Sequence, residues 1–215
     1  MGELLAFPVE RVRRAPSAVL PPAFFFDLGD PFSYLAAERV ERELGEVEWV
    51  PVDGSAFAGP VGDHSAERLR ERAEAHAAEL RLPLVWPDPF PPCARGALRA
   101  AALACELGAG AAFVLAASRL AFCGGFPLDD PEIIAEAAAA AALPLRACLE
   151  AVREKSRDED LQVVAALLRE AGVRRLPAFR VADRWCEGES GLADATALLG
   201  GAESRRISGP LAPHG

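Results

Sequence analysis

The sequence of 215 residues predicts an α/β fold whose two strand-containing parts are separated by a long helical stretch. The first part has the pattern strand, helix, strand, and the last part has two strands followed by a helix. Between them, residues 63–171 show helical spacing of apolar residues and no strand pattern. Because parallel strands require a crossover connection, the first part predicts a parallel pair at the centre of one sheet.

The first strand is predicted over residues 23–28, which include the three successive phenylalanines Phe24 to Phe26. A strand that is apolar at consecutive positions is typical of the middle of a sheet, where both faces are buried. Pro31 then opens a helix that is expected to continue to Leu44, since proline fits the first helical turn. Residues 46–52 alternate apolar and polar side chains, which predicts a second strand parallel to the first.

The middle of the chain predicts a succession of helices joined by short turns. The first of these is followed by a loop in which repeated prolines enforce an extended backbone, from Pro83 to Pro92. The predicted helices cover residues 64–81, 95–107, 111–122, 130–142, 144–155 and 158–171. This region is therefore expected to be an all-helical insertion.

The strand pattern returns over residues 178–181 and 184–187, which Ala182-Asp183 separates as a hairpin turn. A final helix is predicted over residues 190–199, where Gly200-Gly201 should end it. This order of elements is that of a thioredoxin-like fold with a helical insertion. Pro177 precedes the third strand, a usual setting for a cis peptide bond, and the sequence leaves the isomer of Leu176-Pro177 open.

These elements predict one domain interrupted by an insertion, with an extension at each end of the chain. The N-terminal arm covers residues 1–22, and the C-terminal tail covers 201–215. The thioredoxin-like domain is assigned to 23–62 and 172–200, and the insertion to 63–171.

The chain has 32 acidic and 23 basic residues, giving a net charge of −9, which argues against binding to nucleic acid or to an anionic membrane. A small-molecule substrate or a thiol peptide is the expected partner. No apolar run approaches the ~20 residues that a membrane helix needs. The N-terminal arm also lacks the apolar core of a secretory signal, so a cytoplasmic location is expected.

The five cysteines show no C-x-x-C spacing, which predicts reduced thiols and neither a disulfide framework nor a metal site. Cys93 and Cys123 flank part of the helical stretch, but nothing in the sequence indicates that they approach closely enough for a disulfide.

Four segments resemble the DsbA-like group that contains 2-hydroxychromene-2-carboxylate isomerases and kappa-class glutathione transferases. They are FFFDLGDPFSYLAAERV (24–40), LPLVWPDPFPP (82–92), FCGGFPLDDPEIIAEAA (122–138) and GVRRLPAFRV (172–181). The resemblance implies a thioredoxin-like fold with a DsbA-type all-helical insertion. It also implies a glutathione-dependent isomerase or transferase, and a homodimer like the kappa-type relatives.

The resemblance also identifies candidate site residues. It implies catalytic roles for Asp30, Ser33 and Tyr34, and contacts to glutathione from Leu176, Pro177, Glu189 and Ser190. In that group, the residue before the first helical proline is a serine that binds the glutathione sulfur, and in DsbA itself it is the attacking cysteine. Asp30 stands at this position, with Ser33 in place of the second cysteine, so no redox dithiol is present.

Asp30 leaves two functional interpretations open. An ionised carboxylate would repel a thiolate, so Asp30 is expected either to act as a general base with a pKa raised by burial or simply to cap the helix. Other polar positions of the group are also altered: Glu189 has the wrong charge for a carboxylate ligand, and Cys93 replaces an asparagine. The alternatives are therefore an enzyme with Asp30 at its centre and a degenerate binding module without catalysis.

A third hypothesis rests on charge alone. Glu187 and Glu189, facing Asp30 across the predicted cleft, would form an acidic site for a cationic ligand or a metal ion.

Overall fold

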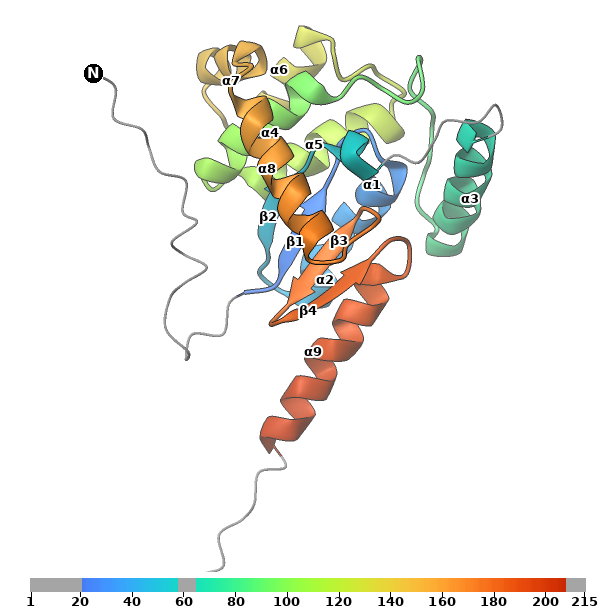
Figure 1. The fold of residues 1–215 in the computed structure, drawn as a ribbon. Helices are drawn as coiled ribbons and strands as arrows, with labels where there is room; N and C mark the ends of the chain where they lie inside the picture. Colours follow the sequence, from blue (N-terminus) through green and yellow to red (C-terminus); the bar gives the residue numbers. More distant parts are fainter. Residues whose placement is uncertain (1–20, 58–64, 208–215) are drawn as a thin grey trace, which may run out of the picture.

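The computed structural model describes residues 21–57 and 65–207, and its centre is a β-sheet with helices on both faces (Figure 1). Within the described residues the sheet has the strand order β2-β1-β3-β4. The strands are β1 (Ala23–Phe26), β2 (Glu48–Pro51), β3 (Ala178–Val181) and β4 (Arg184–Glu187). β1 is parallel to β2 and antiparallel to β3, and β3 forms a hairpin with β4. The α/β fold, the parallel pair and the hairpin are thus as predicted.

The three phenylalanines of β1 fill both faces of the sheet, as their run in the sequence predicts. On one face, the Phe24 ring stacks on Phe179 at a centroid distance of 5.3 Å and meets Trp49 edge-on at 5.0 Å. On the other face, Phe25 packs against Trp185 at 5.2 Å. Burial of aromatic rings on both sides makes β1 the centre of the hydrophobic core.

The helices divide between these two faces. The face of Phe24 and Phe26 is covered by α1 (Pro31–Ala37), α2 (Val40–Leu44) and the first turns of α9 (Gly191–Ile207). The face of Phe25 is covered by α8 (Arg157–Glu170), through Ala165 and Leu168.

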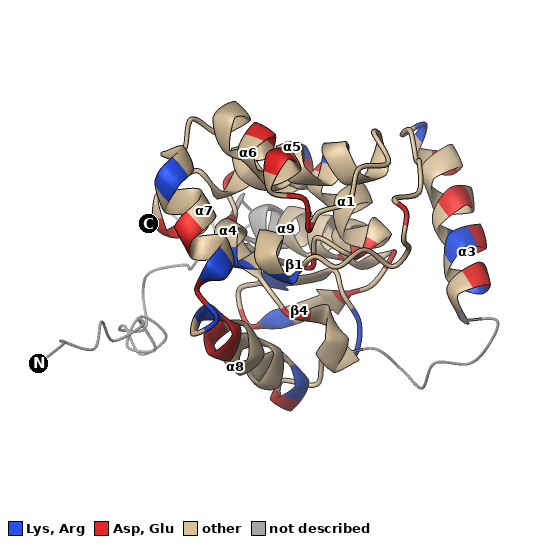
Figure 2. Ribbon diagram, turned by 90° about the horizontal axis from the view of Figure 1, so that it is seen from above, with Lys and Arg blue, Asp and Glu red and all other residues tan. Residues whose placement is uncertain are grey.

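The remaining helical elements lie between β2 and β3 in the sequence; all but η2, which precedes residue 63, fall within the predicted insertion. They are η2 (Gly54–Phe57), α3 (Ser65–Leu80), α4 (Arg95–Glu106), α5 (Gly110–Phe122), α6 (Pro131–Ala140) and α7 (Leu145–Arg153). α3 carries alternating acidic and basic residues and stands at the side of the molecule in both views (Figures 1 and 2). None of the described helices is both long and apolar enough to cross a bilayer.

Two predicted helix ends are wrong. The helix expected over 31–44 is divided into α1 and α2 at Glu38 and Arg39, where the Arg39 backbone departs from helical geometry (φ −128°) and its amide donates to the Ala36 carbonyl at 3.0 Å. α9 does not end at Leu199 but continues through Gly200 and Gly201 to Ile207, so the tail predicted from residue 201 begins as helix. The rest of that tail, residues 1–20 of the N-terminal arm, and His64 lie outside the described residues.

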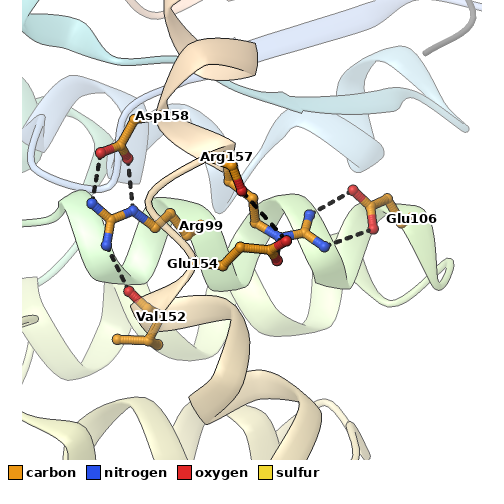
Figure 3. A network of polar contacts seen from close by, with 7 residues as sticks. Arg99, Glu106, Val152, Glu154, Arg157 and Asp158 are labelled. Atoms are coloured by element: carbon orange, nitrogen blue, oxygen red, sulfur yellow. Dashed lines mark hydrogen bonds and ion pairs between the residues drawn. The ribbon is translucent and has the colours of Figure 1, made fainter. Parts of the chain in front are cut away.

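An ion-pair network joins α8 to the helices beside it (Figure 3). Arg99 of α4 is only 8% exposed and donates from Nε and Nη2 to the two carboxylate oxygens of Asp158, each at 2.6 Å. Its Nη1 donates to the Val152 carbonyl of α7 at 2.7 Å. Next to it, Arg157 binds Glu106 and Glu154, both at 2.7 Å. The network therefore fixes three helices at one junction.

Candidate functional site

A cleft of about 560 Å³ opens where β1 passes into α1. Its walls come from the N-terminus of α1, the η2 turn, one side of α3, the proline-rich loop and the turn after β4. Apolar side chains such as Phe32, Phe57 and Leu176 alternate with charged ones around it. The cleft can thus hold a small organic molecule that has an apolar part and charged groups.

Asp30 lies in this cleft as the N-cap of α1, directly before Pro31. One oxygen, Oδ2, accepts from the Ser33 amide at 2.9 Å and from the Ser33 hydroxyl at 2.7 Å. The other, Oδ1, accepts only from the Phe32 amide, at 3.3 Å. The capping role expected from the Asp-Pro sequence is therefore present.

The same surroundings shift the acidity of Asp30. Burial and, to a smaller extent, the neighbouring charge of Asp27 together raise the pKa of its carboxyl from 3.8 to about 7. The hydrogen bonds from Ser33 and Phe32 oppose this shift without cancelling it. A carboxyl group with a pKa near 7 exchanges a proton readily at neutral pH, as a general acid or base must.

Ser33 and Tyr34 follow Asp30 on α1 but are placed differently from it. Ser33 is 3% exposed and lies beneath Asp30, donating its hydroxyl to the carboxylate and accepting from the Asp27 amide at 3.2 Å. Tyr34 is 1% exposed, and its hydroxyl donates to the Pro83 carbonyl at 2.8 Å and lies 3.1 Å from Cys123 Sγ. The structure thus brings Ser33 to Asp30, whereas Tyr34 joins α1 to the proline-rich loop and does not line the cleft.

Leu176 and Pro177 form the opposite edge of the site. The bond between them is cis, which settles the isomer that the sequence left open. The Pro177 carbonyl accepts from the Gly188 amide at 2.8 Å, but the backbone of Leu176 has no hydrogen-bond partner among the described residues. Leu176 lines the cleft and therefore offers a free backbone amide and carbonyl to a ligand.

Glu189 and Ser190 lie in the turn between β4 and α9. Glu189 lines the cleft but forms an ion pair with Arg72 of α3. Ser190 donates to Asp194 of α9 at 3.2 Å and is not among the residues that line the cleft.

Glu187, Glu189 and Asp30 do not form the acidic site that was suggested for a cationic ligand or a metal ion. The Glu187 carboxylate accepts from the Arg174 amide at 2.5 Å, pairs with Arg175 at 3.5 Å and does not line the cleft, while Glu189 is paired with Arg72. Among the described residues, no group of three or more histidine, cysteine or acidic side chains is arranged to hold a metal ion.

The sequence gives no sign of the cations of the cleft, whereas for Asp27, at a strand end, it favours a structural hydrogen-bond partner, which the bonds from Gly29 and Gly54 confirm. Arg72, Arg95 and Arg175 all line the cleft but come from three separate segments that no local pattern connects. Asp27 also lines it, and burial raises the pKa of its carboxyl from 3.8 to about 6. Its position between a buried strand and Gly29 was the available signal, since an acidic side chain there must find backbone donors.

Comparison with known proteins gives relationships through structure alone. No family model and no curated protein sequence matches the chain. A solved structure of 2-hydroxychromene-2-carboxylate isomerase superposes with a TM-score of 0.74 at 17% identity, covering 87% of this chain and 99% of the isomerase. A probable DsbA oxidoreductase from Streptomyces coelicolor superposes with a TM-score of 0.63 at 20% identity, covering 90% and 93% of the two chains. The chain has a DsbA-like thioredoxin fold.

A third structure with this DsbA-like fold is a putative protein disulfide isomerase from Nitrosomonas europaea, with a TM-score of 0.64 at 13% identity over 86% of this chain and 98% of the other. In the protein described here, the helix start in the cleft carries Asp30 and Ser33 instead of thiols. All five cysteines are free; Cys93 is exposed and lines the cleft, whereas Cys123 contacts Tyr34. The DsbA-like fold of this chain thus presents a carboxyl group where a dithiol would be needed for disulfide exchange.

Proposed function

We propose that this DsbA-like protein is an enzyme of the isomerase or transferase type, in which Asp30 moves a proton on a small substrate bound in the cleft. The observation that carries the proposal is the Asp30 carboxyl, which lines an open cleft and has a pKa near 7. Buried structural carboxylates are usually paired with a cation, but Asp30 has none within 4 Å among the described residues. Its acidity is therefore suited to proton transfer.

The two oxygens of Asp30 have different roles in this mechanism. Oδ2 is occupied by the two donors of Ser33, so Oδ1 is the oxygen that takes up and releases the proton. The ionised carboxylate removes a proton from the substrate, and the resulting carboxylic acid returns it at another atom. The bonds and charges balance within the substrate and Asp30, and no oxidant or reductant is consumed.

We further propose glutathione, or a similar thiol peptide, as the co-substrate. The unpaired backbone of Leu176 can form hydrogen bonds with a peptide, and the arginines of the cleft can attract its carboxylates. When protonated, Asp30 can donate a hydrogen bond to the sulfur as a serine would. When ionised, it repels a thiolate instead.

This arrangement predicts that glutathione binds more tightly at pH 6 than at pH 8. With a pKa of about 7, Asp30 is about 90% protonated at pH 6 and about 10% at pH 8, so the dissociation constant should rise about tenfold. Calorimetry at both pH values measures the change. In Asp30→Ser the affinity should vary little between them, and equal affinities in the native protein would refute the donor role of Asp30.

A binding module without catalysis is the second candidate. It is favoured by the ion pairs at the cleft, Arg72 with Glu189 and Arg95 with Asp53 at 3.4 Å, which neutralise the charges that a substrate would use. An assay with 2-hydroxychromene-2-carboxylate, the compound named in the similar isomerase, separates the two candidates. Glutathione binding with no turnover of this or related aromatic substrates would support the binding module.

A homodimer and a cytoplasmic location are further proposals, which follow from the resemblance and from the composition. Light scattering during gel filtration tests the first, and fractionation of cells tests the second.

A further inference from the structure

Asp27 is connected to Asp30 through a short chain of polar contacts. The Asp27 amide donates to the Ser33 hydroxyl at 3.2 Å, and that hydroxyl donates to Asp30 at 2.7 Å. The Asp27 carboxylate accepts from the Gly29 amide at 2.7 Å, which shapes the turn that leads to Asp30. Both carboxyl groups line the same cleft.

The second oxygen of Asp27 holds the η2 turn in place. It accepts from the Gly54 amide at 2.8 Å, although the two residues are 27 positions apart. The contact is so close that a Cβ at Gly54 would lie 2.1 Å from this oxygen. This hydrogen bond fixes the first residue of η2, while Phe57 at its other end packs against the core beside α8.

The charges of Asp53 and Arg95 act on Asp27 in opposite directions, whereas the one charged group that acts on Asp30 is Asp27. Among the described residues, Arg72 pairs with Glu189 and Arg175 with Glu187, and Arg95 lies nearest to Asp53 and Asp158. The remaining titratable residue of the cleft is Cys93. With no cation paired to either, ionisation of one carboxyl disfavours ionisation of the other.

We propose that Asp27 is a positioning residue for Asp30, which fixes the η2 wall of the cleft through Gly54 and, by its own charge, adds to the effect of burial in disfavouring ionisation of Asp30. The inference rests on the proposed function, since it explains what holds the acidity of the proton-transferring carboxyl near neutral pH. Burial raises the pKa of both carboxyls above its ordinary value, to about 6 for Asp27 and about 7 for Asp30. Environments that separate two carboxyl pKa values in this way commonly distinguish the acid from its partner.

Titration of the native protein by carboxyl ¹³C NMR tests the coupling without any variant. The signal of each of the two carboxyls should show two inflections, because each reports the ionisation of its neighbour. Two independent single-step curves would overturn the proposal. Since this measurement needs no substrate, its outcome is separate from whether the protein proves to be an enzyme.

Variants of the full chain then separate charge from position. Asp27→Asn should raise the acid dissociation constant of Asp30 about tenfold, since a like charge nearby is lost, and should speed hydrogen exchange of the amides of residues 55–57. Gly54→Ala should speed the same hydrogen exchange. It should leave the acid dissociation constant of Asp30 at its native value, because the charge of Asp27 remains. Asp130→Asn, which alters the N-cap of α6 outside the cleft, is the control and should leave the titration of Asp30 unchanged. If Asp27→Asn folds and the acid dissociation constant of Asp30 is the same as in the native protein, the proposal is overturned.

Discussion

Replacing Asp30 by asparagine is expected to lower kcat by about 10²–10⁴-fold on any substrate that the native enzyme turns over. Asparagine caps a helix as well as aspartate does, so α1 should keep its start, but an amide cannot accept and return a proton. Steady-state kinetics with the 2-hydroxychromene-2-carboxylate assay, together with circular dichroism, measure the two properties.

Asp130→Asn is the matched control for this variant. Asp130 also precedes a proline, caps α6 through the Glu132 amide at 2.9 Å and lies outside the cleft. Its replacement should leave kcat within about twofold of the native value, since asparagine caps α6 as well as aspartate does and no cleft residue changes. If Asp30→Asn retained native turnover, proton transfer by Asp30 would be excluded.

The same Asp30→Asn variant, which should lower kcat, should gain thermal stability relative to the native protein as the pH rises. A carboxyl whose pKa is raised on folding stabilises the native state at low pH, and this contribution is lost as the pH rises through about 7. The variant lacks this loss. Its Tm relative to the native protein should therefore be higher at pH 8 than at pH 5, as measured by thermal melts at both values.

Replacing Arg99 by methionine is expected to lower the free energy of unfolding by about 3–5 kcal/mol, the usual cost of removing one partner from a buried ion pair. The change leaves the Asp158 carboxylate without its two hydrogen bonds and the Val152 carbonyl without a donor. Denaturation in urea at pH 7 measures the loss.

Two further variants test the origin of that loss. Arg99→Met combined with Asp158→Leu should recover most of the stability, because the unpaired charge is then gone. Arg146→Met is the surface control: Arg146 pairs with Glu150 at 2.9 Å with 91% of its side chain exposed, and its loss should cost less than about 0.5 kcal/mol. A loss of the same small size in Arg99→Met would show that the junction of α4, α7 and α8 does not depend on this pair.

The Arg99 pair should also make stability depend on pH in acid. Arg99 holds the pKa of Asp158 below its ordinary value, so the stabilisation is complete above about pH 4 and disappears as the pH falls through the lowered value. Arg99→Met should therefore show a smaller loss of stability on acidification than the native protein.

The fold was predictable where local pattern decides the structure. Runs such as Phe24 to Phe26 placed β1 at the centre, and Asp30-Pro31 placed the helix start and its cap. The break between α1 and α2 was not predictable, because residues 32–44 contain neither glycine nor proline to mark it.

The candidate site shows the same limit. Asp30 and Ser33 interact within one helical turn, so their relation could be expected from the sequence. The tie from Asp27 to Gly54 spans 27 positions, and the pair of Arg72 and Glu189 spans 117. Contacts at such separations form only when the chain has folded, and no spacing pattern in the sequence predicts them.

The hydroxyl of Tyr34 has a consequence for the ligands that the cleft can admit. It fastens the buried helix α1, which presents Asp30, to the start of the loop whose far end, at Pro91 and Pro92, forms the facing wall. These two sides of the opening are thus joined by the Tyr34 hydrogen bond, whereas α3 is held by Ala73 and Ala77 in the core and, at the rim, by the ion pair of Arg72 with Glu189. A ligand beside Asp30 therefore meets walls that cannot separate without breaking either the Tyr34 hydrogen bond or the packing of α3 on the core, which limits the ligand to the width of the cleft.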